Sequence, residues 1–596
     1  MAEKKVIDNI EKETTAKTKT TKKATTAKKA ATTKKEIATK TAKKPVEKVK
    51  KETPAKKTVV KKEEQSAPDT AAKKQAAKKV EADNTVKKPA AKKTTTKKET
   101  TIRAKKEKVA PVQAVETPQK NRVKILFAAS EAMPFVTTGG MGEVIGALPR
   151  AIMAENPDEF DMRVIMPYYK NIMTNVKVDY IDSIYINLGW RSQYCGVYTV
   201  VSNGVTYYFI DNEYYFKRSS CYGEFDDGER FAFFSKAVLD VMPLIGFVPD
   251  ILQAHDWQAA LSIIYLKTEY KNYELYQNIR SVYTIHNIEY QGKYDISLLE
   301  NLFGISYYHG GILEFGGCIN LTKGAIEAAD IVSTVSPTYA GELTDNFFAH
   351  GLAPIIDRSR DKLRGILNGI DTVYYDPATD GALYQNYDMD HYEKKAENKK
   401  QLQQYLGLDV SADAPLFVMI TRLVAHKGVD LMAQIIHSMM DMGAQLVILG
   451  QGDGYYENMF SDIQQYYPGK MNAYIDYNRD LAGKLYASGD FFIMPSRSEP
   501  CGLAQMIAAR YGTPPIVRAT GGLLDSIRDC TFGEGNGFVF HDYDSFALLE
   551  TIKRAMAVYK TPEDYKNLAL EAMRSDFSWQ RSCKQYMNLY KEMHTW

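Results

Sequence analysis

Short apolar runs alternate with amphipathic segments along this chain from Val123 onward. The runs up to residue 371 read VKILFAA, MRVIMP, VTYYFI, DILQA, SVYTI, DIVSTV and KLRGIL. Strands of this length separated by helical patterns are typical of a parallel, doubly wound sheet. The pattern therefore predicts a Rossmann-like α/β domain over 120–371.

A second series of the same kind follows a less periodic connector that begins after Asp371. Its runs read PLFVMI, QLVIL, NAYI, DFFIMP and PPIV, and they predict a second Rossmann-like domain over 372–576. Doubly wound domains bind ligands beyond the carboxyl ends of their strands. We therefore expect the two domains to face each other across a ligand cleft, with 577–596 forming a terminal helix.

The N-terminal segment has a different composition from the rest of the chain. Its first 120 residues carry about 36 Lys and Arg against about 15 Asp and Glu, a net charge of roughly +21, whereas the remainder is acidic. It repeats Lys-Lys with Ala, Thr and Pro and has no Phe, Trp or Tyr, so burial cannot offset the entropy of folding. We expect a disordered Lys/Ala/Thr-rich tail over 1–119, serving either as a flexible extension or as a tether to a polyanion.

Other features bear on location and cofactors. The N-terminus MAEKKVIDNIEKETT lacks the apolar core of a secretory signal, and the apolar runs are too short to cross a bilayer, so the sequence predicts a cytoplasmic protein. The six cysteines form no CxxC pair, and the chain has no HExxH motif or His and Cys cluster. We therefore expect no bound metal.

The richest stretch for chemistry runs from residue 494 to residue 527. A predicted strand ending at Met494 leads into a loop with Glu499 and then Cys501, Gly502 and Leu503 at the start of a helix. Free N–H groups at a helix start suit an anionic or hydroxyl-rich ligand, and a carboxylate accepts hydrogen bonds from sugar hydroxyls. A second loop, Thr520, Gly521 and Gly522, follows the next apolar run, and we expect both loops to line one cleft edge.

These residues carry a resemblance to the bacterial-type glycogen and starch synthases, a family of retaining glucosyltransferases. The resemblance covers about residues 121–596, because the following motifs occur in family order: KILFAASEAMPFVTTGGMGEVIGALP, DNEYYFKR, ERFAFFSKA, ILQAHDWQAAL, YTIHNIEYQG, STVSPTYAGEL, RGILNGIDT, TRLVAHKGVDL, ILGQGD, SRSEPCGLAQ, RYGTPPIVRATGG and DFSWQRSCKQY. Each motif alone is weak, but this many in one order is specific.

The resemblance implies a GT-B fold and a reaction. It implies transfer of glucose from ADP-glucose to the non-reducing end of an α-1,4-glucan with retention, without metal or pyridoxal phosphate, and a last helix that packs back on the first domain. The partners would be the nucleotide-glucose and glycogen. UDP-glucose as donor, a glucan phosphorylase, and a non-catalytic glucan-binding or polyanion-binding scaffold are the alternatives. A phosphorylase would need a pyridoxal phosphate segment, which nothing here resembles.

The first glycine loop contains the clearest departure from the family. Thr137, Thr138, Gly139 and Gly140 follow the first predicted strand, where glycines let backbone N–H groups approach a phosphate or sugar. The family usually has Lys where this chain has Thr137, and Asp where it has Glu143. A charge contact to the donor is therefore missing from this loop.

The resemblance places four residues in catalytic roles. Arg422 and Lys427 follow a strand, where two cations suit a diphosphate leaving group, and His255 would lie at the donor sugar. Glu499 is interpreted as a sugar anchor, because Ile507 stands where related enzymes carry the second glutamate that a double displacement needs. His286 is interpreted as a structural residue. The other candidate substrate-binding residues are Asn287, Asn368, Gly450, Gly452 and Asp453.

Overall fold

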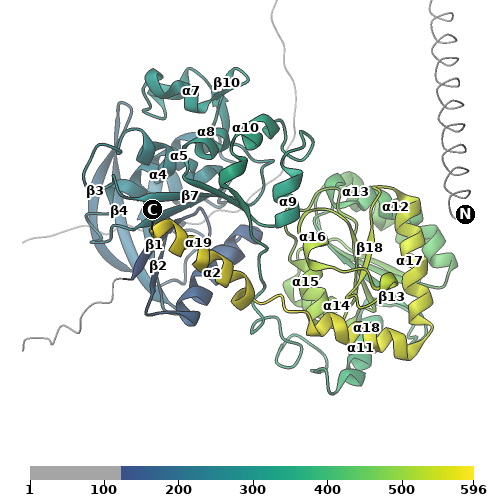
Figure 1. Ribbon diagram of the computed structural model, residues 1–596. Coiled ribbons are helices and arrows are strands. Elements are labelled where there is room, and N and C mark those ends of the chain that lie inside the picture. The colour runs from purple at the N-terminus through teal and green to yellow at the C-terminus, as the bar shows by residue number, and fades with distance from the viewer. Residues whose placement is uncertain (1–121, 596) are drawn as a thin grey trace, which may run out of the picture. The chain divides into compact units, whose positions relative to one another are not determined.

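Residues 122–595 are described by the computed structural model, and the predictions made for the tail 1–119 lie outside the described residues. The described chain folds into two α/β lobes (Figure 1). The predicted fold class, two Rossmann-like domains of the GT-B type, is confirmed for these residues.

The N-terminal lobe is built on a nine-stranded sheet in the order β12-β11-β7-β6-β1-β2-β5-β4-β3. Every pair is parallel except β4 with β5 and β3 with β4. The strands are β1 (Val123–Ala128), β2 (Phe160–Pro167), β3 (Asp179–Leu188), β4 (Arg191–Ser202), β5 (Val205–Asp211), β6 (Ile251–His255), β7 (Arg280–Ile285), β11 (Ile331–Thr334) and β12 (Leu363–Gly365). The hairpin β3–β4 was not predicted, because its residues alternate between tyrosine, aliphatic and charged side chains instead of forming an apolar run.

The C-terminal lobe contains a six-stranded parallel sheet in the order β15-β14-β13-β16-β17-β18. Its strands are β13 (Leu416–Ile420), β14 (Gln445–Leu449), β15 (Met471–Tyr474), β16 (Phe491–Met494), β17 (Pro515–Arg518) and β18 (Phe538–Phe540). The first five coincide with the predicted runs. Strand β18 was missed because its apolar run, FVF, is shorter than the four to eight residues expected of a strand.

Helices cover both sheets (Figure 1). Those of the N-terminal lobe are α2 (Gly140–Glu155), α3 (Glu213–Phe216), α4 (Asp227–Asp240), α5 (Asp256–Lys267), α6 (Leu298–Asn301), α7 (Gly310–Leu313), α8 (Leu321–Ala328), α9 (Pro337–Glu342) and α10 (Ala353–Arg358). Those of the C-terminal lobe are α11 (Lys395–Leu406), α12 (Val429–Asp441), α13 (Gly454–Ile463), α14 (Arg479–Ser488), α15 (Ala504–Arg510), α16 (Gly521–Ser526), α17 (Ser545–Tyr559) and α18 (Pro562–Arg574). A short three-stranded sheet, β8 (Lys293–Asp295), β9 (Glu314–Phe315) and β10 (Cys318–Asn320), completes the N-terminal lobe.

The last helix, α19 (Trp579–His594), returns to the N-terminal lobe and lies against α2 and β1 (Figure 1). Its apolar stripe is buried there, and the Tyr590 hydroxyl donates to Gln253 Oε1 on β6 over 2.7 Å. The lobes also meet where Thr338 at the start of α9 donates to the Asp525 carboxylate of α16, through its backbone N–H at 2.9 Å and its hydroxyl at 2.6 Å.

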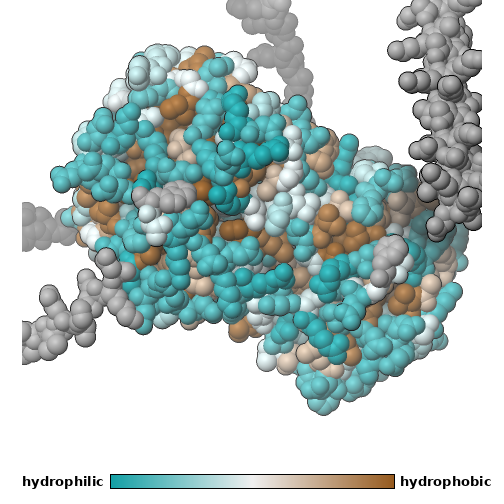
Figure 2. Space-filling view, viewed as in Figure 1, coloured by the Kyte–Doolittle hydropathy of each residue, from teal (hydrophilic) through white to brown (hydrophobic). Residues whose placement is uncertain are grey.

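Hydrophilic residues cover most of the visible surface of both lobes, with apolar residues confined to small patches (Figure 2).

Candidate active site

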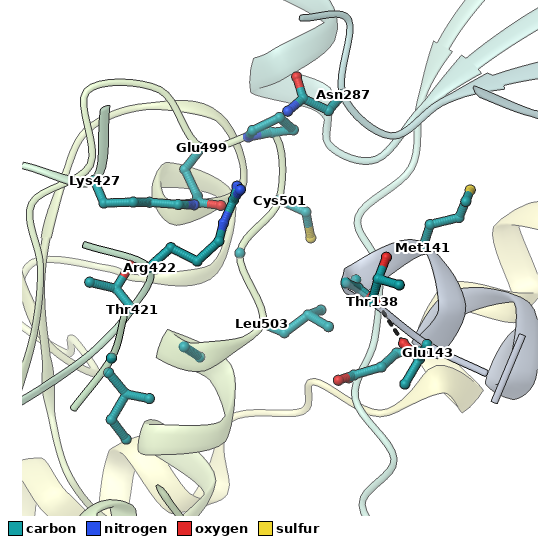
Figure 3. Close-up of a pocket in the computed structure, with 18 of the residues that line it drawn as sticks. Thr138, Met141, Glu143, Asn287, Thr421, Arg422, Lys427, Glu499, Cys501 and Leu503 are labelled. Carbon is teal, nitrogen blue, oxygen red and sulfur yellow. Dashed lines mark hydrogen bonds and ion pairs between the residues drawn. The ribbon is translucent and has the colours of Figure 1, made fainter. Parts of the chain in front are cut away.

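A cleft of about 1980 Å³ lies between the lobes. Its walls are formed by the loops that leave β1, β6 and β7 on one side and β13, β14 and β16 on the other. Figure 3 shows Arg422, Lys427 and Glu499 on the C-terminal wall, across the cleft from Thr138 and Glu143 on the N-terminal wall. The carboxyl ends of the strands thus converge on one cavity, as expected for doubly wound lobes.

A buried ion pair forms the centre of the C-terminal wall. Lys427 Nζ lies 2.7 Å from Glu499 Oε2, and the Ser496 hydroxyl donates to the same oxygen over 2.9 Å. Both partners of the ion pair are largely screened from solvent. Arg422 points toward this pair in Figure 3, and within residues 122–595 its guanidinium forms no ion pair. The wall therefore presents the cation of Lys427, which is paired with the Glu499 carboxylate, and the cation of Arg422, which is available to an anionic ligand.

Two glycines with positive φ hold the Glu499 loop in place. Gly428 (φ 75°) follows Lys427, and a Cβ there would lie 2.1 Å from the Pro495 carbonyl oxygen. Gly521 (φ 43°) lies behind the loop, where a Cβ would come within 2.0 Å of the Glu499 carbonyl oxygen. Because only glycine permits both the conformation and the close approach, these positions fix where the Glu499 side chain lies.

The N-terminal wall carries the first glycine loop. The Thr138 backbone N–H donates to Glu131 Oε2 over 2.5 Å, and the Thr137 hydroxyl donates to the Gly139 carbonyl over 3.0 Å. Burial raises the pKa of Glu131, while the bonds from Thr138 oppose that shift. Glu131 lies three residues beyond the end of β1 and was missed by the sequence reasoning, which considered the loop only from Thr137 onward.

The two candidate histidines lie against each other, one at the end of β6 and the other directly after β7. His255 ends β6 and is completely buried against the Phe127 ring, and it is absent from the cleft lining. His286, interpreted from sequence as structural, lines the cleft, and its Nε2 lies 3.0 Å from His255 Nδ1. Burial lowers the pKa of His286 to about 3 and that of His255 well below its usual range, so both rings are neutral at working pH. His255 lies behind His286, and its Nε2 has no hydrogen-bond partner among the described residues, so its place at the donor sugar stays a prediction.

Asp256 is a strained residue that the sequence reasoning passed over. It follows His255 with φ 54°, a conformation uncommon outside glycine, and it lines the cleft. Its carboxylate accepts the backbone N–H groups of His286 at 2.7 Å and Asn287 at 3.5 Å. Burial raises its pKa to about 7, although these bonds oppose the shift. The carboxylate thus fixes the loop that presents His286 and Asn287 to the cleft.

The cleft brings together most of the predicted site residues. Those that line it are Thr137, Thr138, Gly139, Gly140, Glu143, Asn287, Asn368, Arg422, Lys427, Gly450, Gly452, Glu499, Cys501, Gly502 and Leu503. Besides His255, it leaves out Asp453, Thr520, Gly521 and Gly522.

Each of the residues left out has a structural contact instead. Asp453 caps α13 by accepting the Tyr455 N–H over 2.9 Å. The Thr520 hydroxyl and the Gly521 N–H donate to Glu342 Oε1 of α9, at 2.8 and 3.1 Å, which joins the lobes. The Gly522 N–H donates to the Glu499 carbonyl over 3.2 Å. The second loop packs beneath the first in this structure, and the expectation that both C-terminal loops line the cleft stays a prediction.

Charge is divided between the walls of the cleft. The lysines and arginines among its lining residues all belong to the C-terminal lobe: Arg422, Lys427, Arg479 and Arg497. Arg479, at the start of α14, interacts electrostatically with Glu143 across the cleft. Burial raises the pKa of Glu143, and the Arg479 charge works against that shift. An anionic ligand would therefore be held from the C-terminal side.

Residues 122–595 contain no group of three or more His, Cys, Asp or Glu side chains placed to hold a metal ion. No helix in this part of the chain is long and apolar enough to cross a membrane.

Two Rossmann-like lobes that enclose one cleft, with cations at the strand ends of the second lobe, define a glycosyltransferase of the GT-B class. Residues 124–358 match the starch synthase catalytic domain family, and residues 408–571 match the glycosyl transferases group 1 family. The chain belongs to the glycogen and starch synthase family of glycosyltransferases.

Individual relatives agree with this family. A glycogen synthase of Geobacillus thermodenitrificans is 44% identical over 477 residues, which cover 79% of this chain and 98% of that protein. One from Bacillus cereus is also 44% identical, over 79% of this chain and all of that protein. The catalytic domain of starch synthase IV from Arabidopsis thaliana, solved with ADP and acarbose, superimposes with a TM-score of 0.73 at 33% identity, covering 80% of this chain and all of that one. A sucrose-phosphate synthase from Thermosynechococcus elongatus, at 16% identity and a TM-score of 0.53, shares the fold alone.

Proposed function

We propose that this protein transfers glucose from ADP-glucose to the non-reducing end of an α-1,4-glucan with retention of configuration. The observation that carries the proposal is the cationic wall at the strand ends of the C-terminal lobe, where Arg422 and Lys427 flank the held carboxylate of Glu499. The names of the relatives, glycogen synthases and a starch synthase solved with ADP, support the choice of donor and acceptor.

In this proposal the donor diphosphate binds at Arg422 and Lys427. Negative charge grows on that diphosphate as the bond to glucose C1 breaks, and two fixed cations stabilise it more in the transition state than in the ground state. The side chains would do this without a metal ion or pyridoxal phosphate. Turnover that persists after dialysis against EDTA would support this part of the proposal, and turnover that is lost with EDTA and restored by Mg²⁺ would contradict it.

The glucosyl unit would lie between Glu499 on one wall and His286 and Asp256 on the other. The acceptor O4 forms its bond to C1 on the face from which the diphosphate leaves, and the hydroxyl proton passes to a departing phosphate oxygen. Glu499 is already paired with Lys427, and Ile507 occupies the adjacent cleft wall, so a double displacement with two facing carboxylates is disfavoured at this position.

The test uses the purified full chain with ADP-glucose and glycogen. The expected result is release of ADP with incorporation of glucose in α-linkage, read from the anomeric proton signal by NMR. A parallel assay with UDP-glucose decides the donor, because a higher kcat/KM with UDP-glucose would overturn that part of the proposal. Failure to release either nucleotide in the presence of glycogen would overturn the transferase function as a whole.

A further inference from the structure

Helices α9 and α16 belong to different lobes and lie side by side (Figure 1). Glu342, the last residue of α9, is half-buried in this contact and does not line the cleft. Its Oε1 accepts the Thr520 hydroxyl over 2.8 Å and the Gly521 backbone N–H over 3.1 Å. One carboxylate oxygen of the N-terminal lobe therefore holds two consecutive residues of the C-terminal lobe.

The residues that Glu342 holds are packed against the backbone of Glu499. A Cβ at Gly521 would lie 2.0 Å from the Glu499 carbonyl oxygen, so the two backbones are in direct contact. The Gly522 N–H donates to the carbonyl oxygens of Glu499 and Pro500, each over 3.2 Å. Because this packing leaves no free space, a displacement of Gly521 would also displace the peptide that carries the Glu499 side chain.

A second residue near Glu342 holds the beginning of the same loop. Arg518 Nε donates to the Ser496 carbonyl oxygen over 2.9 Å, and its Nη2 donates to the Arg497 carbonyl oxygen over 2.5 Å. Arg518 also interacts electrostatically with Glu342. The Ser496 hydroxyl in turn donates to Glu499 Oε2. Both ends of the segment 496–500 are thus held by groups that contact Glu342.

Another contact between α9 and α16 serves only to join the lobes. Thr338 donates to the Asp525 carboxylate through its backbone N–H and its hydroxyl. Among residues 122–595, neither of these side chains forms a hydrogen bond with the segment 496–500. Glu342 differs because its partners bear on Glu499. Its Oε2 is buried without a hydrogen-bond partner in the described part of the chain, a cost that a neutral side chain joining the lobes would avoid.

We propose that Glu342 is a positioning residue for Glu499, an inference that rests on the proposed function. By holding Thr520 and Gly521 from the N-terminal lobe, Glu342 fixes the backbone from which the Glu499 side chain reaches the cleft. The ion pair of Glu499 with Lys427 then has its catalytic geometry only where α9 and α16 are in contact. A misplacement of about 1 Å can reduce a rate by about a hundredfold, so this support acts on kcat.

The test compares Glu342→Ala with Asp525→Ala, which removes the other carboxylate of the same contact. Glu342→Gln keeps an oxygen that can accept the bonds from Thr520 and Gly521. Glu499→Gln, with and without Glu342→Ala, completes a double-mutant cycle. For each full-length variant, initial rates of ADP release at saturating glycogen give kcat and the ADP-glucose KM. Deuterium exchange over 496–503 is measured without substrates, and circular dichroism and Tm check the fold.

Glu342→Ala is expected to lower kcat by about tenfold. The ADP-glucose KM should stay nearly unchanged, because the cations proposed to bind the diphosphate stand on another loop. Glu342→Gln should keep most of the wild-type kcat, and Asp525→Ala should lower Tm without the loss of kcat. In the Glu499→Gln background, Glu342→Ala should cause little further loss, because both changes act through one side chain.

Equal kcat losses in Glu342→Ala and Asp525→Ala would overturn the proposal. Losses that multiply fully in the Glu499→Gln background, or no recovery of kcat in Glu342→Gln, would also overturn it. If Glu342→Ala does not fold, Thr520→Val removes one of the two bonds and is judged by the same comparisons.

The deuterium exchange separates this proposal from the proposed function. If the wild-type chain releases no ADP, the proposed function fails. Faster exchange over 496–503 in Glu342→Ala than in Asp525→Ala would still show that Glu342 holds the Glu499 loop, and equal exchange would refute it.

Discussion

Replacing Thr137 by lysine tests how the cleft manages the donor's charge. In the structure the cationic lining residues all belong to the C-terminal lobe, and the glycine loop opposite carries only the neutral Thr137 and Thr138 with Glu143 nearby. Gly142 closes the space behind Thr137, since a Cβ there would lie 2.5 Å from the Thr137 hydroxyl oxygen. A lysine side chain at position 137 would therefore extend into the cleft.

The expected gain follows from the charges around the loop. A hydrogen bond between an ammonium and a phosphate contributes about 1.5–3 kcal/mol. Glu131 and Glu143 lie beside the loop and would compete for the new ammonium, so we expect the lower end of this range. Thr137→Lys should therefore lower the ADP-glucose KM by roughly tenfold, with little change in kcat. Thr137→Met, similar in length and uncharged, is the matched control.

A double-mutant cycle identifies the cation that serves in place of the lysine. Arg479 lines the cleft and already interacts with Glu143 of the opposite wall. If it holds the donor, Arg479→Met should raise the ADP-glucose KM about tenfold in the wild type and by less in the Thr137→Lys background. The assay is initial-rate ADP release at saturating glycogen. Equal KM values for Thr137→Lys and Thr137→Met would refute the idea that this loop lacks a needed charge.

Three further outcomes are expected. Glu499→Gln and Lys427→Met should each lower kcat by orders of magnitude. Because the two groups form one ion pair at 2.7 Å, the fold-loss of kcat in the double variant should be smaller than the product of the two single fold-losses. Multiplicative losses in single-turnover rates would contradict this. His286→Ala should reduce kcat with the fold intact, whereas His255→Ala should lower Tm through loss of a buried side chain, and the reverse pattern would restore His255 to the site. Asp256→Asn keeps a side chain that tolerates positive φ. Because burial raises the pKa of Asp256 to about 7, the wild type loses stability as pH rises from about 4 through 7, and the Tm of the variant relative to wild type should increase between pH 5 and pH 8. A constant Tm difference would mean that Asp256 stays ionised across this range.

The sequence by itself determined that the chain forms two α/β lobes and which loops follow their strands. Apolar runs such as Leu416–Ile420 and Gln445–Leu449 are buried on both faces, so composition alone is enough to mark them as parallel strands. Loop residues that follow such strands were expected at the cleft for the same reason, and Arg422, Lys427 and Glu499 are there. The β3–β4 hairpin escaped this reasoning because half of its residues face solvent.

Tertiary structure alone decided which loop residues reach the cleft. His255 and Asp256 are neighbours in sequence, yet the positive φ of Asp256 turns the chain so that the aspartate enters the cleft and the histidine stays behind His286. The second glycine loop, Thr520–Gly522, has the same local pattern as the first, but it packs under the Glu499 loop and contacts Glu342 of the other lobe. Local sequence specifies that a loop follows a strand, whereas the direction of each side chain depends on backbone angles and on packing between residues far apart in the chain.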